Sequence, residues 1–394
     1  MNPLKKLFKQ TAIYGLATVL PRMLSFLLLP LYTGVLATAG YGEISIIFAW
    51  FAIFNVLLAY GMETAFFRFY NGNFDKENVV STSLMSLLFT TILFFIVALA
   101  AKNSISEFSD IPMRYIRYAI YILALDALVI VPFAWLRANE RPLRYAVIKI
   151  LNMVVNLGLN VFFLLYFPNV MTDQTDSFFG WMYKPNYEIS YIFISNLIAS
   201  GFTLVLMLPL YLKNKYAFDL DLWKRMMRYA WPVLVAGIAF TINEVFDRIL
   251  LENLLPEAVA KSEVGKYSAC YKLALFMTLF ATAFRMGIEP FFFSHAGSEN
   301  PQKAYAQITN YFVVLGSVIM LAVVVFADFL KILFIKNPDY WEAMSVVPLI
   351  ILASFFLGIY HKLSVWYKVT DKTRYGAFIS MIGAIITIGI NYTF

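Results

Sequence analysis

Charged and amide side chains stand inside several long apolar stretches of the chain, where a charge in lipid costs at least about 2.5 to 3.5 kcal/mol. The most regular set lies in residues 146–167, where Lys149, Asn152, Asn156 and Asn160 follow one another at intervals of three or four residues. On a helix this spacing places all four on one face. Such a face either hydrogen-bonds neighbouring helices or lines a wet cavity in which sugar hydroxyls bind. We expect the cavity, because Lys149 stands at one end of the stripe.

A second cluster of charges lies in residues 229–254. Glu244 and Arg248 are four residues apart and can pair on one helical face, while Asp247 adds a second carboxylate. An internally neutralised pair is one interpretation. In the other, Arg248 binds phosphate oxygens through its planar fork, and a proton or sodium ion on Asp247 frees it to do so.

Three further ionisable residues stand alone in apolar stretches. Arg22 follows a proline and either binds an anionic substrate group or pairs with a carboxylate in its own bundle. Lys272 follows Tyr267 and Tyr271, a stripe that suits sugar and phosphate contacts but is also compatible with ordinary packing. Asp126 is a candidate carrier of a proton or cation, or a protonated and hydrogen-bonded acid.

Two glutamates stand at the ends of apolar stretches. Glu63 lies near Arg68, and Glu289 lies near Arg285. Charge pairs at these places could gate the inner mouth of a cavity, although glutamates at a membrane interface need no special role.

Membrane-spanning helices must hold these groups, because the composition excludes a soluble globule. The 394 residues are 61% hydrophobic and 14% charged, with a mean hydropathy of +0.71, whereas soluble domains are about 25% charged. Apolar runs long enough to cross a bilayer as helices recur along the chain. The sequence therefore predicts an all-α polytopic membrane protein. The predicted spans are 11–36, 44–62, 79–101, 115–136, 146–167, 189–212, 229–254, 264–285, 304–329, 342–360 and 375–392.

The distribution of basic residues predicts the orientation. With a cytoplasmic N-terminus, nineteen Lys and Arg residues fall in the inner loops and seven in the outer loops, as the positive-inside rule requires of a plasma-membrane protein. The net charge of +7 is thus explained by topology rather than by nucleic-acid binding. The first span resembles a signal peptide, but Pro21 and Arg22 interrupt it, so we count it as retained. A lone Cys270 and two histidines give no metal spacing, and no cofactor is expected.

Short segments recur at an offset near 230 residues. The pairs are 61–67 with 287–293, 157–160 with 388–391, and Gly42 and Ser45 with Gly265 and Ser268. Unless these matches are chance, they indicate two pseudo-repeated six-helix bundles, residues 1–218 and 219–394, around a central cavity. The second bundle then has five of its six helices, so we expect a twelfth span beyond Phe394.

The residues also carry a family resemblance. Its signals are Lys6-Leu7-Phe8-Lys9, Tyr14-Gly15-Leu16, Leu20-Pro21-Arg22, the run from Phe26 to Thr33, Gly40-Tyr41-Gly42, and the segment from Val264 to Ala274. These resemble the polysaccharide biosynthesis (oligosaccharide flippase) family of the multidrug, oligosaccharidyl-lipid and polysaccharide exporter superfamily. The resemblance implies twelve to fourteen helices in two bundles that move a polyprenyl-diphosphate-linked glycan to the outer leaflet. The family's cavity cations would correspond to Arg22, Arg248, Lys149 and Lys272.

We therefore expect a non-enzymatic flippase that works by alternating access in cell-surface polysaccharide or lipopolysaccharide synthesis. Its expected partners are a lipid-linked oligosaccharide, membrane lipids, a proton or sodium ion, and glycan polymerase or ligase machinery. A multidrug or cation antiporter of the same superfamily is one alternative, and it would need a mainly acidic, aromatic cavity. A membrane glycan polymerase is the other, and it would need catalytic residues on a sizeable outer loop. The chain has no G-x-x-x-x-G-K-[ST] motif, so we expect an ion gradient rather than ATP to drive transport.

Overall fold

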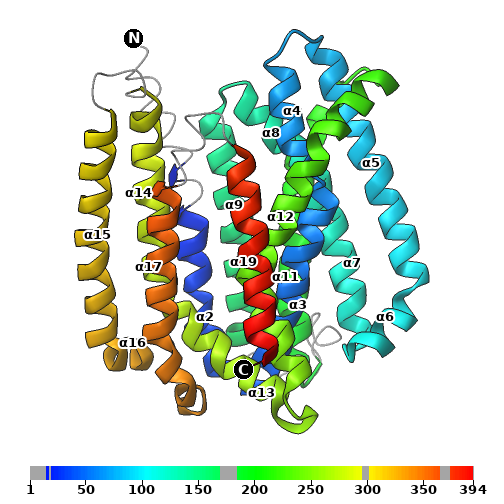
Figure 1. Cartoon of the computed structure of the whole chain (residues 1–394). Helices are drawn as coiled ribbons and strands as arrows, with labels where there is room; N and C mark the ends of the chain where they lie inside the picture. The colour runs from blue at the N-terminus through cyan, green and yellow to red at the C-terminus, as the bar shows by residue number, and fades with distance from the viewer. Residues whose placement is uncertain (1–14, 17–18, 169–183, 295–300, 364–372, 394) are drawn as a thin grey trace. The chain divides into compact units, whose positions relative to one another are not determined.

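The structure, a computed structural model, describes residues 15–16, 19–168, 184–294, 301–363 and 373–393 (Figure 1). These residues form helices and contain no strand. Eight helical stretches are long and apolar enough to cross a membrane, and two shorter apolar helices cover Val19–Val35 and Phe378–Thr393. The prediction of an all-α polytopic membrane protein is confirmed, and each of the eleven predicted spans overlaps a described helix.

The described chain divides into two compact units. Unit 1 comprises Met1–Ser45 and Leu250–Gly383, and unit 2 comprises Ile46–Ile249 and Ala384–Phe394. The predicted boundary between two bundles at residue 218 stays a prediction.

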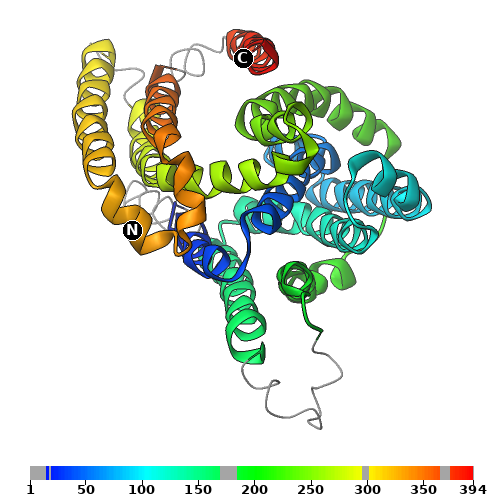
Figure 2. The same cartoon turned by 90° about the horizontal axis from the view of Figure 1, so that it is seen from below.

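Figure 2 shows the helices of unit 2 from below. Their bounds are α3 (Thr38–Ala59), whose first turns lie in unit 1, α4 (Met62–Tyr70), α5 (Lys76–Ala100), α6 (Lys102–Ser109), α7 (Met113–Leu128), α8 (Ile130–Ala138), α9 (Pro142–Val161), α11 (Glu188–Lys213) and α12 (Leu220–Leu254). A π-helical turn, Phe162–Tyr166, continues α9. Among these helices α11 packs against both α7 and α9.

Unit 1 contains the remaining helices. They are α2 (Leu28–Val35), α13 (Glu257–Tyr271), α14 (Leu275–Ser294), α15 (Pro301–Val325), α16 (Ala327–Phe334), α17 (Val347–Leu363) and most of α19 (Thr373–Thr393). A 3-10 turn, Lys272–Ala274, separates α13 from α14 inside one predicted span. Within the unit α14, α15 and α17 lie side by side (Figure 1).

A glycine in the left-handed region separates α3 from α4. Gly61 has a φ of 73°, a backbone conformation that is unfavourable for residues with a Cβ atom. A Cβ placed there would also lie 2.4 Å from the carbonyl oxygen of Ala230. The predicted span ended at residue 62, but the turn at Gly61 lets the chain continue as α4 and pack against α12.

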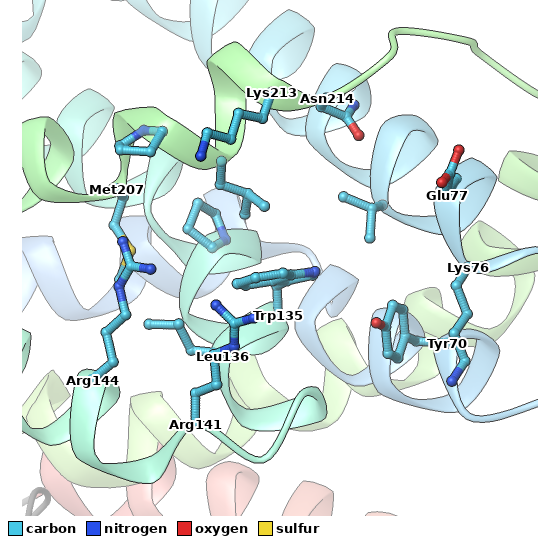
Figure 3. A pocket seen from close by; sticks show the side chains of 14 residues that line it. Tyr70, Lys76, Glu77, Trp135, Leu136, Arg141, Arg144, Met207, Lys213 and Asn214 are labelled. Carbon is cyan, nitrogen blue, oxygen red and sulfur yellow. The ribbon is translucent and has the colours of Figure 1, made fainter.

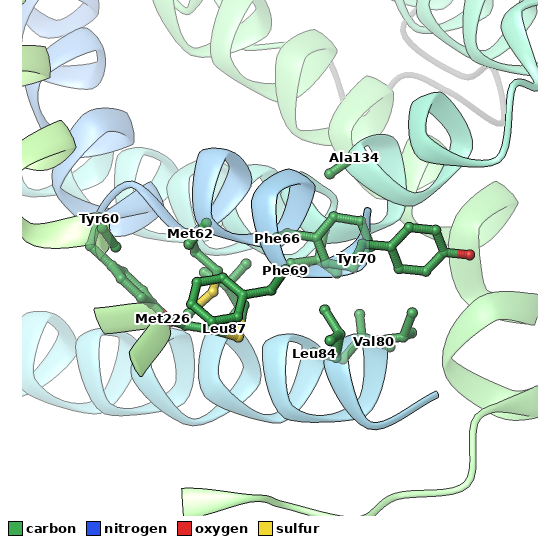
Figure 4. Packing of buried hydrophobic residues seen from close by; sticks show 14 of the residues in the cluster. Tyr60, Met62, Phe66, Phe69, Tyr70, Val80, Leu84, Leu87, Ala134 and Met226 are labelled. Atoms are coloured by element: carbon green, nitrogen blue, oxygen red, sulfur yellow. The ribbon is translucent and has the colours of Figure 1, made fainter. Parts of the chain in front are cut away.

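The core of unit 2 gathers large side chains between α4, α5, α8 and α12. Figure 4 shows Phe66 and Phe69 of α4 packed over Leu84 and Leu87 of α5, with Met226 of α12 alongside. Because lipid is as apolar as this core, close packing and internal hydrogen bonds rather than water exclusion must hold the helices together.

One buried hydroxyl provides such hydrogen bonds. Ser86 Oγ lies 2.7 Å from Tyr60 Oη and accepts from Trp223 Nε1 at 2.8 Å. These bonds tie α5 to the end of α3 and to α12, and they satisfy polar atoms that would be costly to bury alone.

In unit 1, α13 crosses the first turns of α3 at two glycines. A Cβ on Gly42 would lie 1.7 Å from the carbonyl oxygen of Lys261, and a Cβ on Gly265 would lie 1.9 Å from that of Thr38. Thr38 Oγ1 and Ser262 Oγ are hydrogen-bonded at 2.7 Å beside the crossing. The contact is reciprocal between Gly42 and Gly265, two glycines that the predicted repeat makes equivalent.

Candidate functional site

A cavity of about 500 Å³ lies within unit 2 among α3, α4, α7, α8, α9 and α11, and is here called the polar cavity. Its volume is within the range of about 300 to 1,000 Å³ that is usual for small-molecule sites. Its polar lining residues are Asn55, Glu63, Asp126, Tyr145, Lys149, Asn152, Asn196, Ser200 and Thr203.

Helical periodicity places most of these polar groups. On α9, Tyr145, Lys149 and Asn152 are four and three residues apart, so they share one face. On α11, which packs against α9, Asn196, Ser200 and Thr203 have the same spacing and line the same cavity. The two polar faces therefore oppose each other across the cavity.

Asp126 and Lys149 bring opposite charges into the polar cavity. Ser200 Oγ donates a hydrogen bond to Asp126 Oδ1 at 2.7 Å, and Lys149 Nζ lies 4.2 Å from the centroid of the Phe133 ring. The two charges interact through space, but neither forms an ion pair within 4.0 Å with any described residue. Lys149 is therefore held by a ring face, which leaves its N–H donors available to an anionic ligand.

The asparagine stripe divides along α9. Asn152 Nδ2 donates to Thr203 Oγ1 at 2.9 Å and lines the polar cavity. Asn160 is fully buried, and its Nδ2 donates to the backbone oxygen of Asn156 at 2.8 Å and to its side-chain oxygen at 3.1 Å. Asn152 thus lines the polar cavity, whereas Asn156 and Asn160 bond to one another further along the helix. A substrate role for all three asparagines stays a prediction.

Glu63 forms an ion pair with Arg137 of α8. The sequence placed it beside Arg68, but five residues along a helix turn the two side chains about 140° apart. Arg68 instead lies 4.3 Å from the centroid of the Tyr229 ring. The side chain of Glu289, the second predicted gate, lies outside the described residues.

The charges of α12 are in contact with one another. Arg248 Nη1 lies 3.4 Å from Asp247 Oδ1 and donates to the backbone carbonyl of Glu244 at 3.2 Å. Arg248 therefore contacts Glu244 through its backbone carbonyl rather than its carboxylate, and it forms an ion pair with Asp247.

The remaining residues predicted to bind substrate, Arg22 and Lys272, belong to unit 1. Arg22 has an exposed side chain. Lys272 stands at the 3-10 turn after α13, with Nζ 5.6 Å from the centroid of the Tyr41 ring. All the other described candidates belong to unit 2. Among the described residues no group of three or more His, Cys, Asp or Glu side chains is placed to hold a metal ion.

Sequence reasoning missed the α11 side of the polar cavity and the partner of Glu63. The spacing of Asn196, Ser200 and Thr203 within the predicted span 189–212 was a signal for the first. No local pattern joins Glu63 to Arg137, which lies on a different helix.

Comparisons with known proteins agree on family and fold. The sequence model of the family described as "Polysaccharide biosynthesis protein" matches residues 7–295, and the MatE family model matches residues 221–393. Protein 1 of the Lsg locus of Haemophilus influenzae is 23% identical over 293 residues, which cover 73% of this chain but just under two thirds, 66%, of that protein.

Two solved structures show the same fold at low identity. One is a multidrug resistance MATE family transporter of the MOP superfamily in an inward-facing conformation, with 13% identity, a TM-score of 0.65 and 94% of each chain covered. The other is a MOP superfamily transporter from Pyrococcus furiosus, described by the reverse polarity of its binding pocket. It has 13% identity and a TM-score of 0.58, with 100% of this chain and 97% of that chain covered.

Proposed function

Because the chain belongs to the polysaccharide biosynthesis protein family and has the fold of the MOP superfamily transporters, we propose that it flips a polyprenyl-diphosphate-linked oligosaccharide from the cytoplasmic to the outer leaflet of the plasma membrane. The solved structures that share this fold are transporters rather than enzymes. The observation that carries the proposal is the polar cavity, in which a lysine that forms no ion pair with any described residue stands beside amide and hydroxyl groups.

The lining of the polar cavity suits the two chemistries of this substrate. Lys149 supplies a positive charge for a phosphate oxygen. Asn152, Asn196 and Thr203 supply donors and acceptors for sugar hydroxyls. A volume of about 500 Å³ accommodates part of an oligosaccharide, while the polyprenyl tail stays in the surrounding bilayer.

We assign ion coupling to two half-buried carboxylates, those of Asp126 and Asp247. Asp126 shares the polar cavity with Lys149, so a proton or sodium ion on Asp126 would release Lys149 to an anionic ligand. In the same way, an ion on Asp247 would release Arg248, whose Nη1 lies 3.4 Å from Asp247 Oδ1. In both pairs, the coupling ion competes with the basic side chain for the carboxylate, and the substrate phosphate competes with the carboxylate for the basic side chain. Binding of the ion therefore favours binding of the substrate, as coupled transport requires.

The test is transport of a labelled polyprenyl-diphosphate glycan by the full chain reconstituted in proteoliposomes. Lys149→Gln should slow flipping about tenfold or more, because a hydrogen bond to a charged group contributes about 1.5 to 3 kcal/mol. Lys149→Arg should keep most of the activity. Lys184→Gln is the matched control, because Lys184 Nζ also lies over a ring, 5.5 Å from the centroid of Tyr187, outside the cavity. Wild-type flipping by Lys149→Gln would contradict the assignment.

A multidrug or cation antiporter is the second candidate. The MatE match over residues 221–393 and the carboxylate of Asp126 in the polar cavity favour it. An antiporter should export an organic cation, and Asp126→Asn should abolish that export. The flippase should instead move the diphosphate-linked glycan and leave the cation where it is.

A further inference from the structure

Unit 2 contains a second, basic pocket of about 410 Å³ that shares no lining residue with the polar cavity. It lies where α4 and α11 end, where α5 and α9 begin, and beside α8. Figure 3 shows Arg141, Arg144 and Lys213 around one end of the pocket, and Lys76 with Glu77 at the other. Four cations thus face one carboxylate.

The positive charge of the basic pocket is not neutralised by the protein. None of the four cations forms an ion pair with any residue in the described ranges, and all four side chains are exposed. Two of them lie over rings instead. Arg141 is 4.8 Å from the centroid of Trp135, and Lys76 is 5.2 Å from that of Tyr70. Ring faces orient the cations but leave their donors free for an external anion.

A buried amide points to the same kind of ligand. Asn214, which follows the last residue of α11, lines the basic pocket, and its buried Nδ2 has no hydrogen-bond acceptor among the described residues. Buried donors are normally paired. A ligand in the basic pocket with several acceptor oxygens would satisfy this amide together with the cations that line the same pocket.

The place of the basic pocket selects the class of anion. It lies at the ends of four helices and beside α8, on the side that the distribution of Lys and Arg predicts to be cytoplasmic. Pro132, Leu136 and Leu210 add apolar surface to its wall. Basic pockets between transmembrane helices at this level bind phosphorylated lipid headgroups. We propose that the basic pocket binds the phosphate-bearing headgroup of an anionic membrane phospholipid.

The test is native mass spectrometry of the full chain in neutral detergent, titrated with short-chain cardiolipin and, separately, with phosphatidylcholine. Arg144→Gln with Lys213→Gln should weaken cardiolipin binding about thirtyfold, which is about 2 kcal/mol at 1.4 kcal/mol per tenfold. Phosphatidylcholine binding should be weak and unchanged. Lys215→Gln with Arg225→Gln is the matched control, because it removes the same two residue types from exposed positions outside the pocket.

Asn214→Leu separates a ligand contact from a structural role. Replacing an unpaired buried amide by an apolar group of similar size should leave the melting temperature unchanged or raise it. It should still weaken cardiolipin binding severalfold. A lower melting temperature with unchanged binding would overturn the role of Asn214 as a ligand.

Three other outcomes would overturn the proposal. Equal losses in the pocket variant and in the control variant would mean that cardiolipin binds through diffuse surface charge. Displacement of cardiolipin by equimolar inorganic pyrophosphate would identify a soluble phosphate as the ligand. Binding of a polyprenyl diphosphate but not of cardiolipin would make the pocket part of the transport path.

Discussion

Replacing Gly42 with alanine should force α3 and α13 apart. The new Cβ would lie 1.7 Å from the carbonyl oxygen of Lys261, whereas ordinary contact begins at 3.4 Å, so the two helices must separate by about half of that contact distance. The Cβ is fixed by the backbone of α3 and the oxygen belongs to the backbone of α13, so no side-chain rotation can relieve the clash. The separation would also break the hydrogen bond of 2.7 Å between Thr38 and Ser262.

The expected cost of Gly42→Ala follows from these two losses. Overpacking a tight contact costs about 1 to 3 kcal/mol, and an interhelical hydrogen bond in a membrane protein contributes about 0.6 kcal/mol on average. The free energy of unfolding should therefore fall by about 2 to 3.5 kcal/mol, a factor of about 30 to 300 in the unfolding equilibrium constant. Equilibrium unfolding of the purified full chain in mixed micelles measures this change.

Gly158→Ala is the matched control, because no atom lies within 4 Å of a Cβ at that position. It should stabilise the protein by about 0.5 to 1 kcal/mol, since glycine inside a helix loses more backbone entropy than alanine. The double variant Gly42→Ala with Gly265→Ala should cost less than the sum of the two single changes, because one separation relieves both clashes. Wild-type stability of Gly42→Ala, or strict additivity in the double variant, would refute a shared close contact.

Gly61→Ala should lower the melting temperature, because the left-handed conformation costs about 1 to 2 kcal/mol for any L-residue and the new Cβ would lie 2.4 Å from the carbonyl oxygen of Ala230. Gly389→Ala, with no atom within 4 Å, should not lower it, and equal melting of the two variants would count against strain at Gly61. For topology, Lys184→Cys should react with an impermeant thiol reagent in intact cells, whereas Lys215→Cys should react only after permeabilisation. The reverse labelling pattern would invert the predicted orientation.

The sequence determined the properties that depend on composition and on helical periodicity. Apolar runs of bilayer length predicted the helices, because a backbone in lipid must satisfy its own hydrogen bonds. The spacing of Lys149 and Asn152 placed both on one face of α9, and the structure has both lining the polar cavity. The motifs at the N-terminus and in residues 264–274 were sufficient to identify the family.

The tertiary structure decided which helical face meets which neighbour. Ser200 bonds to Asp126 across 74 residues of chain, and Glu63 pairs with Arg137 rather than with the nearby Arg68. Asn214 likewise lines the basic pocket together with residues from helices that are distant from it in the sequence. In a soluble helix the apolar stripe marks the inward face, but lipid is as apolar as the protein interior, so the sequence of a span carries only a weak signal of its packing direction. The partner of each intramembrane polar group is therefore fixed only when the helices pack.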